Sequence, residues 1–555
     1  MMNSLPKLRE MTLLHLVRRG RDGYPDALAV RDASTSLTYG ALWDRASRAA
    51  GGLRRAGINH GDAVMMMLDN SAEAFVAFVA LSFLGAIPVP TNPTFRGALL
   101  EHLVTETGCV AAIVSSERAA DLRAAGAGQI ATIISRESDP ADQALAASGE
   151  DLISWSSVLD AEPIEPIEVG PWDVLAIICT SGTTGLSKGV LTTHAQAISM
   201  CRHLSFFQDT TSLSQEDVHL VVAPLFHAFG IFAGLVAPLL TGASAYVVAA
   251  FRPSMFWEEV RKSGATMACL VGPMTDFILA QPASDADADN SLASVYILPR
   301  TPSAADFEKR FNVQSASGFG SSEAGTTMLN VESADVDRGI VGRPRMGLQA
   351  RLVDEHDFDV EQGEVGELIV RDDDPWVMTP GYVGRPEATV ELYRNGWMHT
   401  GDLMRVDDAG LFHFVDRAKD SIRRRGENIS SFELELQASD HPGIAECAAV
   451  GVGHPADQEV LLVVRRTQGV GVSETEIVEF LIGRVPHFCV PRYVHFVEDF
   501  PRTPTGKIRK RDLRELGDVA WDREVAGIVV RRAPLTGSVT LPAVLDASTR
   551  GVPQP

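Results

Sequence analysis

The first third of the chain alternates between two patterns of apolar residues. Apolar positions recur at helical intervals over residues 41–56 and 72–85, whereas residues 63–68 and 87–90 are short, nearly continuous apolar runs. The helical spacing predicts helices, and short apolar runs between turn residues predict buried strands. Repeated alternation of helix and strand is typical of a largely parallel sheet in an α/β fold.

Two longer apolar stretches, residues 74–90 and 228–250, approach the length of a membrane-spanning helix. The first ends in a proline-rich turn, and Pro238, Thr241 and Gly242 interrupt the second. A membrane span needs about 20 consecutive apolar residues. We therefore predict that each stretch is a buried helix running into a buried strand, and that the chain has no membrane span.

The pattern changes after Gly363, where strands become shorter and turn residues more frequent, as at residues 367–370 and 411–415. A single core rarely grows beyond about 250–300 residues, so a chain of 555 residues requires at least two domains. We predict an α/β fold with a large N-terminal domain of mostly parallel sheets plus a β-rich part (1–416), a small C-terminal α+β domain (417–520) and a tail (521–555).

Composition narrows the functional classes. Hydrophobic residues make up 45% and charged residues 22% of the chain, as in soluble globular proteins. The net charge of −23 disfavours binding to nucleic acids or anionic membranes. The six cysteines form no C-x-x-C pair, and residues 1–22 lack the continuous apolar core of a signal peptide. These features predict a soluble protein of the reducing cytoplasm without a zinc site or disulfides.

A segment dense in small polar residues follows the apolar run 174–178. Gly182 and Gly185 permit a tight turn that points backbone N–H groups at an anion. Hydroxyl and ammonium donors surround the same spot, namely Thr180, Ser181, Thr183, Thr184 and Lys188. Donors in this number after a buried strand predict a loop that binds a polyphosphate.

The spacing of this loop excludes the nucleoside-triphosphatase pattern G-x-x-x-x-G-K-[ST]. Only two residues separate Gly182 from Gly185, and two more separate Gly185 from Lys188. The segment alone leaves one alternative open, an ordinary surface turn rich in Ser, Thr and Gly.

Five further segments follow in a fixed order: 224–227 (PLFH), 318–323 (GFGSSE), 397–402 (WMHTGD), 416–429 (DRAKDSIRRRGENI) and 501–508 (PRTPTGKI). With the Gly/Thr loop they closely resemble the adenylate-forming superfamily of acyl-CoA synthetases, peptide-synthetase adenylation domains and beetle luciferases. The resemblance spans nearly the whole chain. Residues 295–302, in place of a Gly-Gly-Ala-Pro-like segment, and residues 425–435 are similar to the crotonobetaine/carnitine–CoA ligase subgroup.

The resemblance implies an ATP-dependent acid–thiol ligase. A carboxylate attacks the α-phosphorus of ATP to give an acyl adenylate and pyrophosphate, and the thiol of CoA then displaces AMP. The first step depends on alignment and charge neutralisation rather than on covalent help from the protein. Transfer to a carrier-protein thiol or an amine, a non-catalytic binding protein and a luciferase-like oxygenase are the alternatives.

The resemblance also implies the nucleotide site. Residues 180–188 would wrap the β- and γ-phosphates, and Phe319 would lie flat on the adenine with Gly320 and Ser322 beside it. Glu323 would bind Mg²⁺, a hard cation that prefers carboxylate and phosphate oxygens.

Two further positions complete the site that the resemblance implies. Asp402 would accept hydrogen bonds from both ribose hydroxyls, and Arg417 would support the ribose–phosphate region. Lys507 would bridge the substrate carboxylate and the α-phosphate, and with His227 and Glu323 it forms the predicted catalytic set. Taken alone, Asp402 is also typical of a turn, Glu323 of a helix cap and His227 of a hydrogen-bonded core histidine.

In the family the small domain is mobile. It would rotate about Lys419, bring Lys507 to the carboxylate, and then open a thiol path past Gly426. The partners would be a carboxylic acid, ATP and CoA, whereas the identity of the acid and the formation of a homodimer stay open. The acyl pocket would be walled by the segment after His227 and the strand before Glu323, which contain Phe229, Gly230, Phe232, Gly234, Ser317 and Gly318.

Overall fold

The computed structural model describes residues 7–125, 128–136, 152–180, 188–207, 211–212, 214–298, 300–301, 303–330, 339–418, 420, 422–424, 427–454, 457–482, 484–503 and 506–530. The chain divides into two compact units, Met1–Phe414 and Val415–Pro555. Each unit has its own apolar core.

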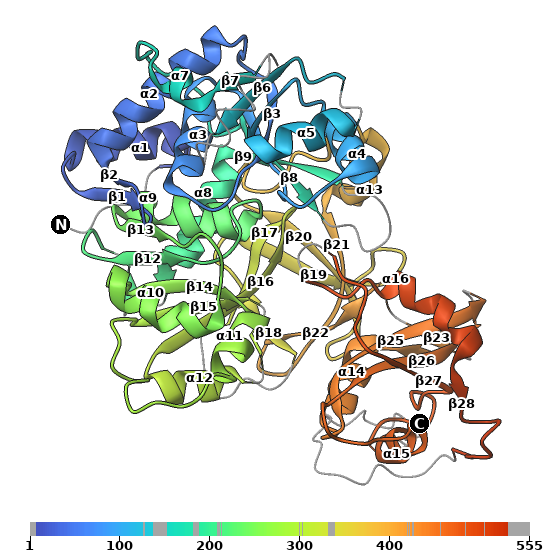
Figure 1. Ribbon diagram of the computed structural model, residues 1–555. Coiled ribbons are helices and arrows are strands. Elements are labelled where there is room, and N and C mark those ends of the chain that lie inside the picture. The colour runs from blue at the N-terminus through green and yellow to red at the C-terminus, as the bar shows by residue number, and fades with distance from the viewer. Residues whose placement is uncertain are drawn as a thin grey trace, which may run out of the picture. The chain divides into compact units, whose positions relative to one another are not determined.

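A five-stranded parallel sheet opens the first unit, and helices cover both of its faces (Figure 1). The helices α2 (Tyr39–Arg55) and α3 (Ala72–Phe83) pack on one face, and α4 (Gly97–Thr107) and α5 (Ser116–Ala124) pack on the other. Coverage of both faces explains why the strands read as continuous apolar runs. In spatial order they are β4 (Ile87–Pro90), β3 (Ala63–Met67), β5 (Ala111–Ser115), β6 (Thr132–Arg136) and β7 (Leu152–Ser154).

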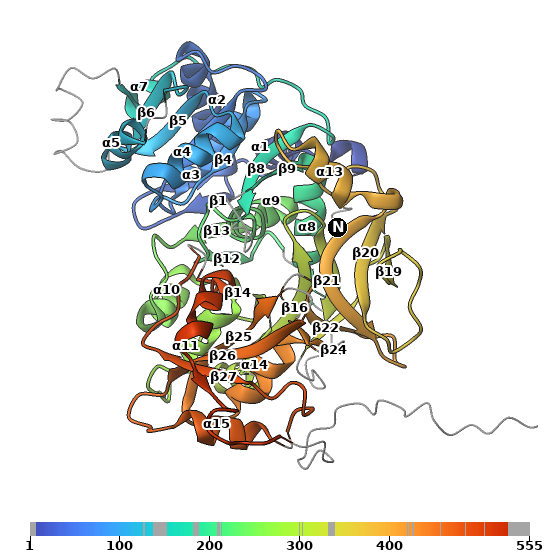
Figure 2. The same cartoon turned by 90° about the vertical axis from the view of Figure 1, so that its right-hand side faces the viewer.

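A second, 13-stranded sheet changes from parallel to antiparallel along its width. Its parallel part runs through β1 (Leu28–Arg31), β13 (Ser244–Val247), β12 (Val218–Val221), β14 (Met267–Val271), β15 (Ser294–Leu298) and β16 (Gln314–Ser321). Beyond β16 the neighbours are β17 (Gly325–Asn330), β18 (Ile340–Pro344), β22 (Phe412–Arg417), β21 (Met398–Val406), β20 (Gly366–Asp372) and β19 (Leu348–Val353) (Figure 2). The short strand β2 (Ser36–Thr38) ends the other edge.

Helices cover both faces of the parallel part of this sheet. On one face lie α10 (Phe256–Ser263), α11 (Gly272–Leu279) and α12 (Ala304–Phe311). The other face is covered by η3 (Phe229–Val236), next to α8 (His194–Ser205) and α9 (Ala237–Thr241). Further helices in the described part of the unit are η1 (Leu8–Glu10), α1 (Leu13–Gly23), α7 (Trp155–Leu159), η4 (Pro253–Met255), α13 (Pro386–Leu392) and η5 (Arg394–Gly396).

The predicted α/β class is confirmed, and the two long apolar stretches are helices that run into strands. Residues 74–90 comprise most of α3 followed by β4, and residues 228–250 comprise η3, α9 and β13. Among the described residues, no helix has the length and apolar character needed to cross a membrane.

The second unit is built on a four-stranded sheet, β25 (Ile444–His454), β26 (Asp457–Arg466), β27 (Tyr493–Val497) and β28 (Trp521–Asp522). One face carries α14 (Ser431–Ser439) and α15 (Glu474–Leu481), and the other carries α16 (Lys510–Leu513) and η6 (Arg514–Val519). A hairpin of β23 (Ile422–Arg424) and β24 (Glu427–Ile429) precedes α14.

The first residues of the predicted tail, which starts at residue 521, pair with the sheet of the second unit. Trp521 pairs with Val494 in the sheet, and the Asp522 carboxylate forms an ion pair with Arg492 at 3.1 Å. Arg523 is buried and donates to the carbonyl of Pro491 at 3.1 Å. A strand of two residues has no period to detect, so the apolar pattern gave no sign of it.

Two buried histidines make the stability of the fold dependent on pH. His194 opens α8, and its Nδ1 accepts a hydrogen bond from the backbone N–H of Leu13 at 3.1 Å, which joins α8 to α1. A ring nitrogen that accepts is unprotonated, so this contact requires the neutral imidazole. Burial lowers the pKa of His194 to about 3 and the pKa of His219, in the centre of β12, to about 4.

We expect the free energy of unfolding to fall as the pH decreases from about 6.5 towards these folded-state pKa values. Because both pKa values lie below the ordinary value of about 6.5, the unfolded chain takes up protons first, at roughly 2 kcal/mol per histidine by pH 5. In His194→Asn the side-chain oxygen keeps an acceptor for Leu13 and no longer titrates. Urea denaturation at pH 7 and pH 5 should show a smaller loss for this variant than for the wild type, and an equal loss would contradict the assignment.

Candidate functional site

A hairpin presents the Gly/Thr loop. β8 (Val174–Thr180) and β9 (Lys188–Thr193) pair antiparallel, with Thr180 opposite Lys188 as the last pair. The Thr180 hydroxyl donates to the Lys188 carbonyl at 3.4 Å. The buried strand expected at residues 174–178 is confirmed. The loop residues Ser181, Gly182, Thr183, Thr184 and Gly185 lie outside the described residues.

Tyr382 brings two predicted site residues to one place. Its hydroxyl donates to Oε1 of Glu323 at 3.0 Å, and the Lys188 ammonium lies 4.8 Å from the centre of its ring. An ammonium over an aromatic face is attracted by the ring quadrupole. A carboxylate and a cation that are 135 residues apart in the chain therefore converge on one phenol, and no sequence motif had singled out Tyr382.

Backbone pairing holds Tyr382 there. The Leu191 N–H donates to the Gly381 carbonyl at 3.0 Å, and the Val383 N–H donates to the Gly189 carbonyl at 2.9 Å. Residues 381–383 thus lie as a short antiparallel partner beside β9, with an isolated bridge between Val190 and Tyr382.

Glu323 lies in the turn between β16 and β17, not at a helix start. The amide of Gln196, on α8, donates to the carbonyls of Ser322 at 2.9 Å and Glu323 at 3.0 Å. The Thr379 N–H donates to the Glu323 carbonyl at 2.9 Å. Gln196 is fully buried, so a buried side chain that sequence reasoning missed holds the β16–β17 turn in place.

Phe319 and Gly320 occupy the end of β16. The Phe319 ring lies 5.7 Å from the ring of Phe414, at 36° to it. A Cβ on Gly320 would lie 2.1 Å from the carbonyl oxygen of Gly325, which is closer than any real contact. The close approach of β17 therefore requires glycine at this position.

Asp402 is almost fully buried on β21, with 1% of its surface exposed. The preceding Gly401 has φ of 70°, which favours glycine, and its N–H donates to Oε1 of Glu367 at 3.0 Å. The other oxygen of Glu367 lies 3.0 Å from Nδ1 of His399. Glu367 thus fixes the bend of β21 that places Asp402, and no motif had pointed to it.

His227 ends the Pro224–His227 turn that leads into η3. The Asn70 side chain anchors the turn: its Oδ1 accepts from the Leu225 N–H at 2.9 Å and its Nδ2 donates to the Ala223 carbonyl at 3.0 Å. The rings of Phe226 and His227 are 4.6 Å apart.

The expected walls of the acyl pocket are more closed than their glycines suggest. A Cβ on Gly318 would lie 2.2 Å from the Tyr296 hydroxyl oxygen, and one on Gly230 would lie 1.9 Å from the Pro224 carbonyl oxygen. Tyr296 is buried with its ring 6.2 Å from that of Phe229. Phe232 is fully buried in the core against α8. Protein atoms therefore fill the space that these glycines leave.

Lys507 and Arg417 belong to the second unit. Lys507 is exposed and follows Gly506, which has φ of 82°. The turn is closed by hydrogen bonds from the Thr503 N–H to the Lys507 carbonyl at 2.7 Å and from the Lys507 N–H to the Thr503 hydroxyl at 3.1 Å. Arg417 is half-buried at the end of β22. Lys419 and Gly426 lie outside the described residues.

The side chains present suit Mg²⁺ and a nucleotide. Within the described ranges, no group of three or more His, Cys, Asp or Glu side chains could hold a metal alone. A single carboxylate such as Glu323 is what Mg²⁺ needs when phosphate oxygens and water supply its other ligands. The neighbouring Lys188 carries a positive charge of the kind that phosphates require.

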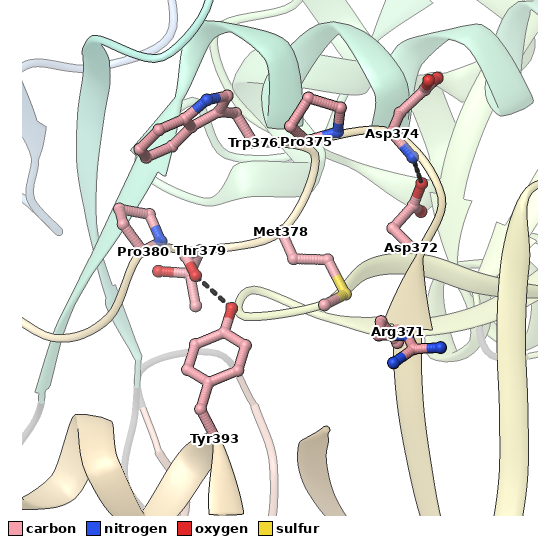
Figure 3. A pocket seen from close by; sticks show the side chains of 9 residues that line it. All are labelled: Arg371, Asp372, Asp374, Pro375, Trp376, Met378, Thr379, Pro380 and Tyr393. Atoms are coloured by element: carbon pink, nitrogen blue, oxygen red, sulfur yellow. Dashed lines mark hydrogen bonds between the residues drawn. The ribbon is translucent and has the colours of Figure 1, made fainter. Parts of the chain in front are cut away.

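A separate surface cavity of about 340 Å³ adjoins the Glu323 turn through Thr379 (Figure 3). The Tyr393 hydroxyl, which lines it, donates to the Thr379 carbonyl, and the Thr379 N–H in turn binds the Glu323 carbonyl. The predicted site residues do not line this cavity, whose walls are Arg371, Asp372, Asp374, Pro375, Trp376, Met378, Thr379, Pro380 and Tyr393.

Comparison with known proteins identifies the class. The AMP-binding enzyme family matches residues 17–383, and the AMP-binding enzyme C-terminal domain matches residues 433–507. A feruloyl-CoA synthase of Amycolatopsis sp is 34% identical over 504 residues, which cover 90% of this chain and 97% of that protein. A crotonobetaine/carnitine–CoA ligase of Citrobacter koseri is 29% identical over 492 residues, covering 86% and 93%.

A solved structure of an ATP-bound protein is also similar to this chain. The crystal structure of ATP-bound MatB from Rhodopseudomonas palustris has a TM-score of 0.79 at 26% identity and covers 91% of this chain and 99% of that chain. The chain belongs to the AMP-binding enzyme family, which confirms the predicted superfamily. It is an AMP-forming acyl-CoA synthetase, which uses ATP, Mg²⁺ and CoA to convert a carboxylic acid into its CoA thioester through an acyl adenylate.

We expect Gly320→Ala to destabilise the first unit, because the new Cβ must displace the Gly325 carbonyl. Overpacking of this kind costs about 1–3 kcal/mol. Thermal unfolding monitored by circular dichroism measures the loss. Gly23→Ala is the matched control, since a Cβ there meets no atom within 4 Å. Equal melting temperatures for the two variants would contradict the close contact between β16 and β17.

Proposed function

We propose that ATP binds in the first unit between the β8–β9 hairpin and the β16–β17 turn. The convergence of Lys188 and Glu323 on Tyr382 carries this proposal. Residues 180–188 take the β- and γ-phosphates, with Lys188 as the cation, and Glu323 holds Mg²⁺. Bound Mg²⁺ supplies charge neutralisation for the phosphate oxygens.

The remaining nucleotide contacts come from side chains whose surroundings suit them. Phe319, held beside Phe414, offers an aromatic face to the adenine, with Gly320 and Ser322 next to it. The Asp402 carboxylate, in a buried position fixed through Gly401, accepts from the ribose hydroxyls. A buried carboxylate forms strong hydrogen bonds because water does not compete.

We propose that the second unit supplies the cation for adenylation. Lys507 neutralises the charge that moves from the carboxylate to the α-phosphate, Arg417 supports the ribose–phosphate region, and His227 borders the acyl group. The C-terminal domain, beginning at residue 417, rotates about Lys419 between the half-reactions, and CoA passes Gly426 in the second.

All six cysteines are free, and burial raises the pKa of Cys109, Cys179 and Cys447 to about 12. Unreactive buried thiols suit a reducing compartment, so we place the enzyme in the cytoplasm. Homodimer formation stays a prediction from the sequence.

Lys507→Ala should separate the half-reactions. Loss of the cation should slow acyl-adenylate formation at least about 100-fold, because charge stabilisation of this kind is worth several kcal/mol. The variant should still convert a supplied acyl adenylate and CoA to acyl-CoA. Pyrophosphate release and thioester formation measure the two steps, and Lys309→Ala, at an exposed lysine on α12, is the control. Adenylation at the wild-type rate would refute the role.

We further propose that the acid is compact and carries an aromatic ring. Tyr296 occupies the space beside Gly318, which limits the length of an acyl group, and Phe229 adds a second ring to the same cluster. The similarity to a feruloyl-CoA synthase and to the 4-coumarate–CoA ligase 4 of Arabidopsis thaliana, 27% identical over 517 residues, supports an aromatic acid.

Pyrophosphate release with ferulate, 4-coumarate, benzoate, crotonobetaine and palmitate tests the acid class. We expect kcat/KM for at least one aromatic acid to exceed that for palmitate about 100-fold, because the filled pocket excludes the long chain sterically. Reactions without CoA separate adenylation from thioester formation. A preference for palmitate would show that Tyr296 does not close the pocket.

A further inference from the structure

Lys510 lies three residues after Lys507, at the start of α16, and its ammonium is held by α14. The Nζ atom is 2.7 Å from Oε1 of Glu435 and 2.6 Å from the hydroxyl of Ser431. The two charged side chains are 20% and 19% exposed, so this ion pair is largely withdrawn from water. The resemblance assigned Lys510 no role.

The contact continues to the strand at which the second unit begins. The Ser431 hydroxyl, which accepts from Lys510, donates to Oδ1 of Asp416 at 3.1 Å, and the Ser431 N–H donates to Oδ2 at 2.6 Å. The hydroxyl of Ser430 donates to the Val415 carbonyl at 2.5 Å. A continuous chain of hydrogen bonds therefore runs from Lys510 to Asp416, at the end of β22.

Glu435 also ties this chain to the sheet. Its Oε1 accepts from the N–H of Ala449 at 2.7 Å, on β25, which is an edge strand. α14 packs on one face of the sheet, whereas Leu513 of α16 packs on the other (Figure 1). Lys510 thus reaches around the edge of the sheet and joins the elements on its two faces.

The charges in this cluster depend on one another. Burial raises the pKa of both Asp416 and Glu435. Burial acts to lower the pKa of Lys510, but the attraction and hydrogen bond of Glu435 and the charge of Asp416 outweigh it and raise the pKa above its usual value. The ammonium stays protonated at neutral pH, and its removal would leave a buried carboxylate without its partner.

Arg502 is a second charged anchor of the turn that carries Lys507. Arg502 forms an ion pair with Glu446 of β25 at 2.5 Å, with side chains 34% and 25% exposed. Partly exposed ion pairs contribute little to stability. An ion pair that is withdrawn from water and hydrogen-bonded holds its side chains more firmly. Of these two anchors on either side of Lys507, Lys510 is the more withdrawn from water.

We propose that Lys510 is a positioning residue for Lys507. Through Glu435 and Ser431 it fixes the Lys507 turn to α14, and Ser431 continues the hydrogen bonds to Asp416, which lies before the proposed hinge at Lys419. The inference rests on the proposed role of Lys507 in adenylation.

The test is Lys510→Met with separate assays of the half-reactions. Displacement of a reacting group by about 1 Å can cost about 100-fold, so kcat for adenylation should fall between 10- and 100-fold. KM for ATP and the acid should change little, and conversion of a supplied acyl adenylate should stay within about twofold. Lys510→Arg, which keeps the charge, should recover most of the loss. A purely structural role would lower both half-reactions together.

Two further variants distinguish a loss of Lys507 positioning from misfolding. Lys510→Met/Glu435→Gln removes the unpaired buried charge, and it should recover the melting temperature but not adenylation. Arg509→Gln removes a neighbouring charge that pairs only with the exposed Asp512 among the described residues, at 3.1 Å, and it should behave as the wild type.

Parallel loss of both half-reactions in the double variant, or unchanged adenylation in Lys510→Met, would overturn the inference. Lys507→Ala, assayed alongside, separates the two proposals: if it keeps adenylation the proposed function fails, and if it alone loses adenylation only the role of Lys510 fails.

Discussion

The backbone pairing of residues 381–383 with β9 is the contact on which the proposed ATP site in the first unit depends. It places the Tyr382 ring against Lys188 and the Tyr382 hydroxyl on Glu323. The same segment supplies the Thr379 N–H to the Glu323 carbonyl, while Gln196 holds the turn from α8. Three parts of the chain are thereby fixed around one carboxylate and one ammonium, and electrostatic preorganisation of this kind limits the rearrangement that a bound triphosphate would require.

Close packing in the same way shapes the region that is proposed to bind the acyl group. Gly318, Gly230 and Gly320 are places where another part of the protein comes too near for a side chain. At Gly318 the neighbour is the Tyr296 hydroxyl, so a glycine that would suggest depth in the sequence marks a filled wall in the structure. In the second unit, a buried network with one ammonium and two carboxylates carries the proposed positioning of Lys507, because charges withdrawn from water are held by their partners.

Local pattern was sufficient for several early elements of the first unit. The strands β3 and β4 and the helices α2 and α3 follow from apolar spacing, because each buries a continuous face. Pattern failed at β28, whose two residues have no period, and there pairing with β27 decides the structure. Glu323, in a turn, and Asp402, on β21, stand in sequence motifs, but Tyr382, Gln196 and Glu367 do not, since each acts through contacts to residues distant in the chain.

The sequence by itself determined the α/β class, the family, the reaction and the order of its motifs, because these depend on residue types at short, fixed spacings. Only the tertiary structure decided that Lys188 and Glu323 share one tyrosine, that Tyr296 fills the space beside Gly318, and that Lys510 is joined through Ser431 to Asp416. Contacts of this kind depend on which strands become neighbours and on how closely two backbones approach. A local sequence pattern contains neither the strand order nor that distance.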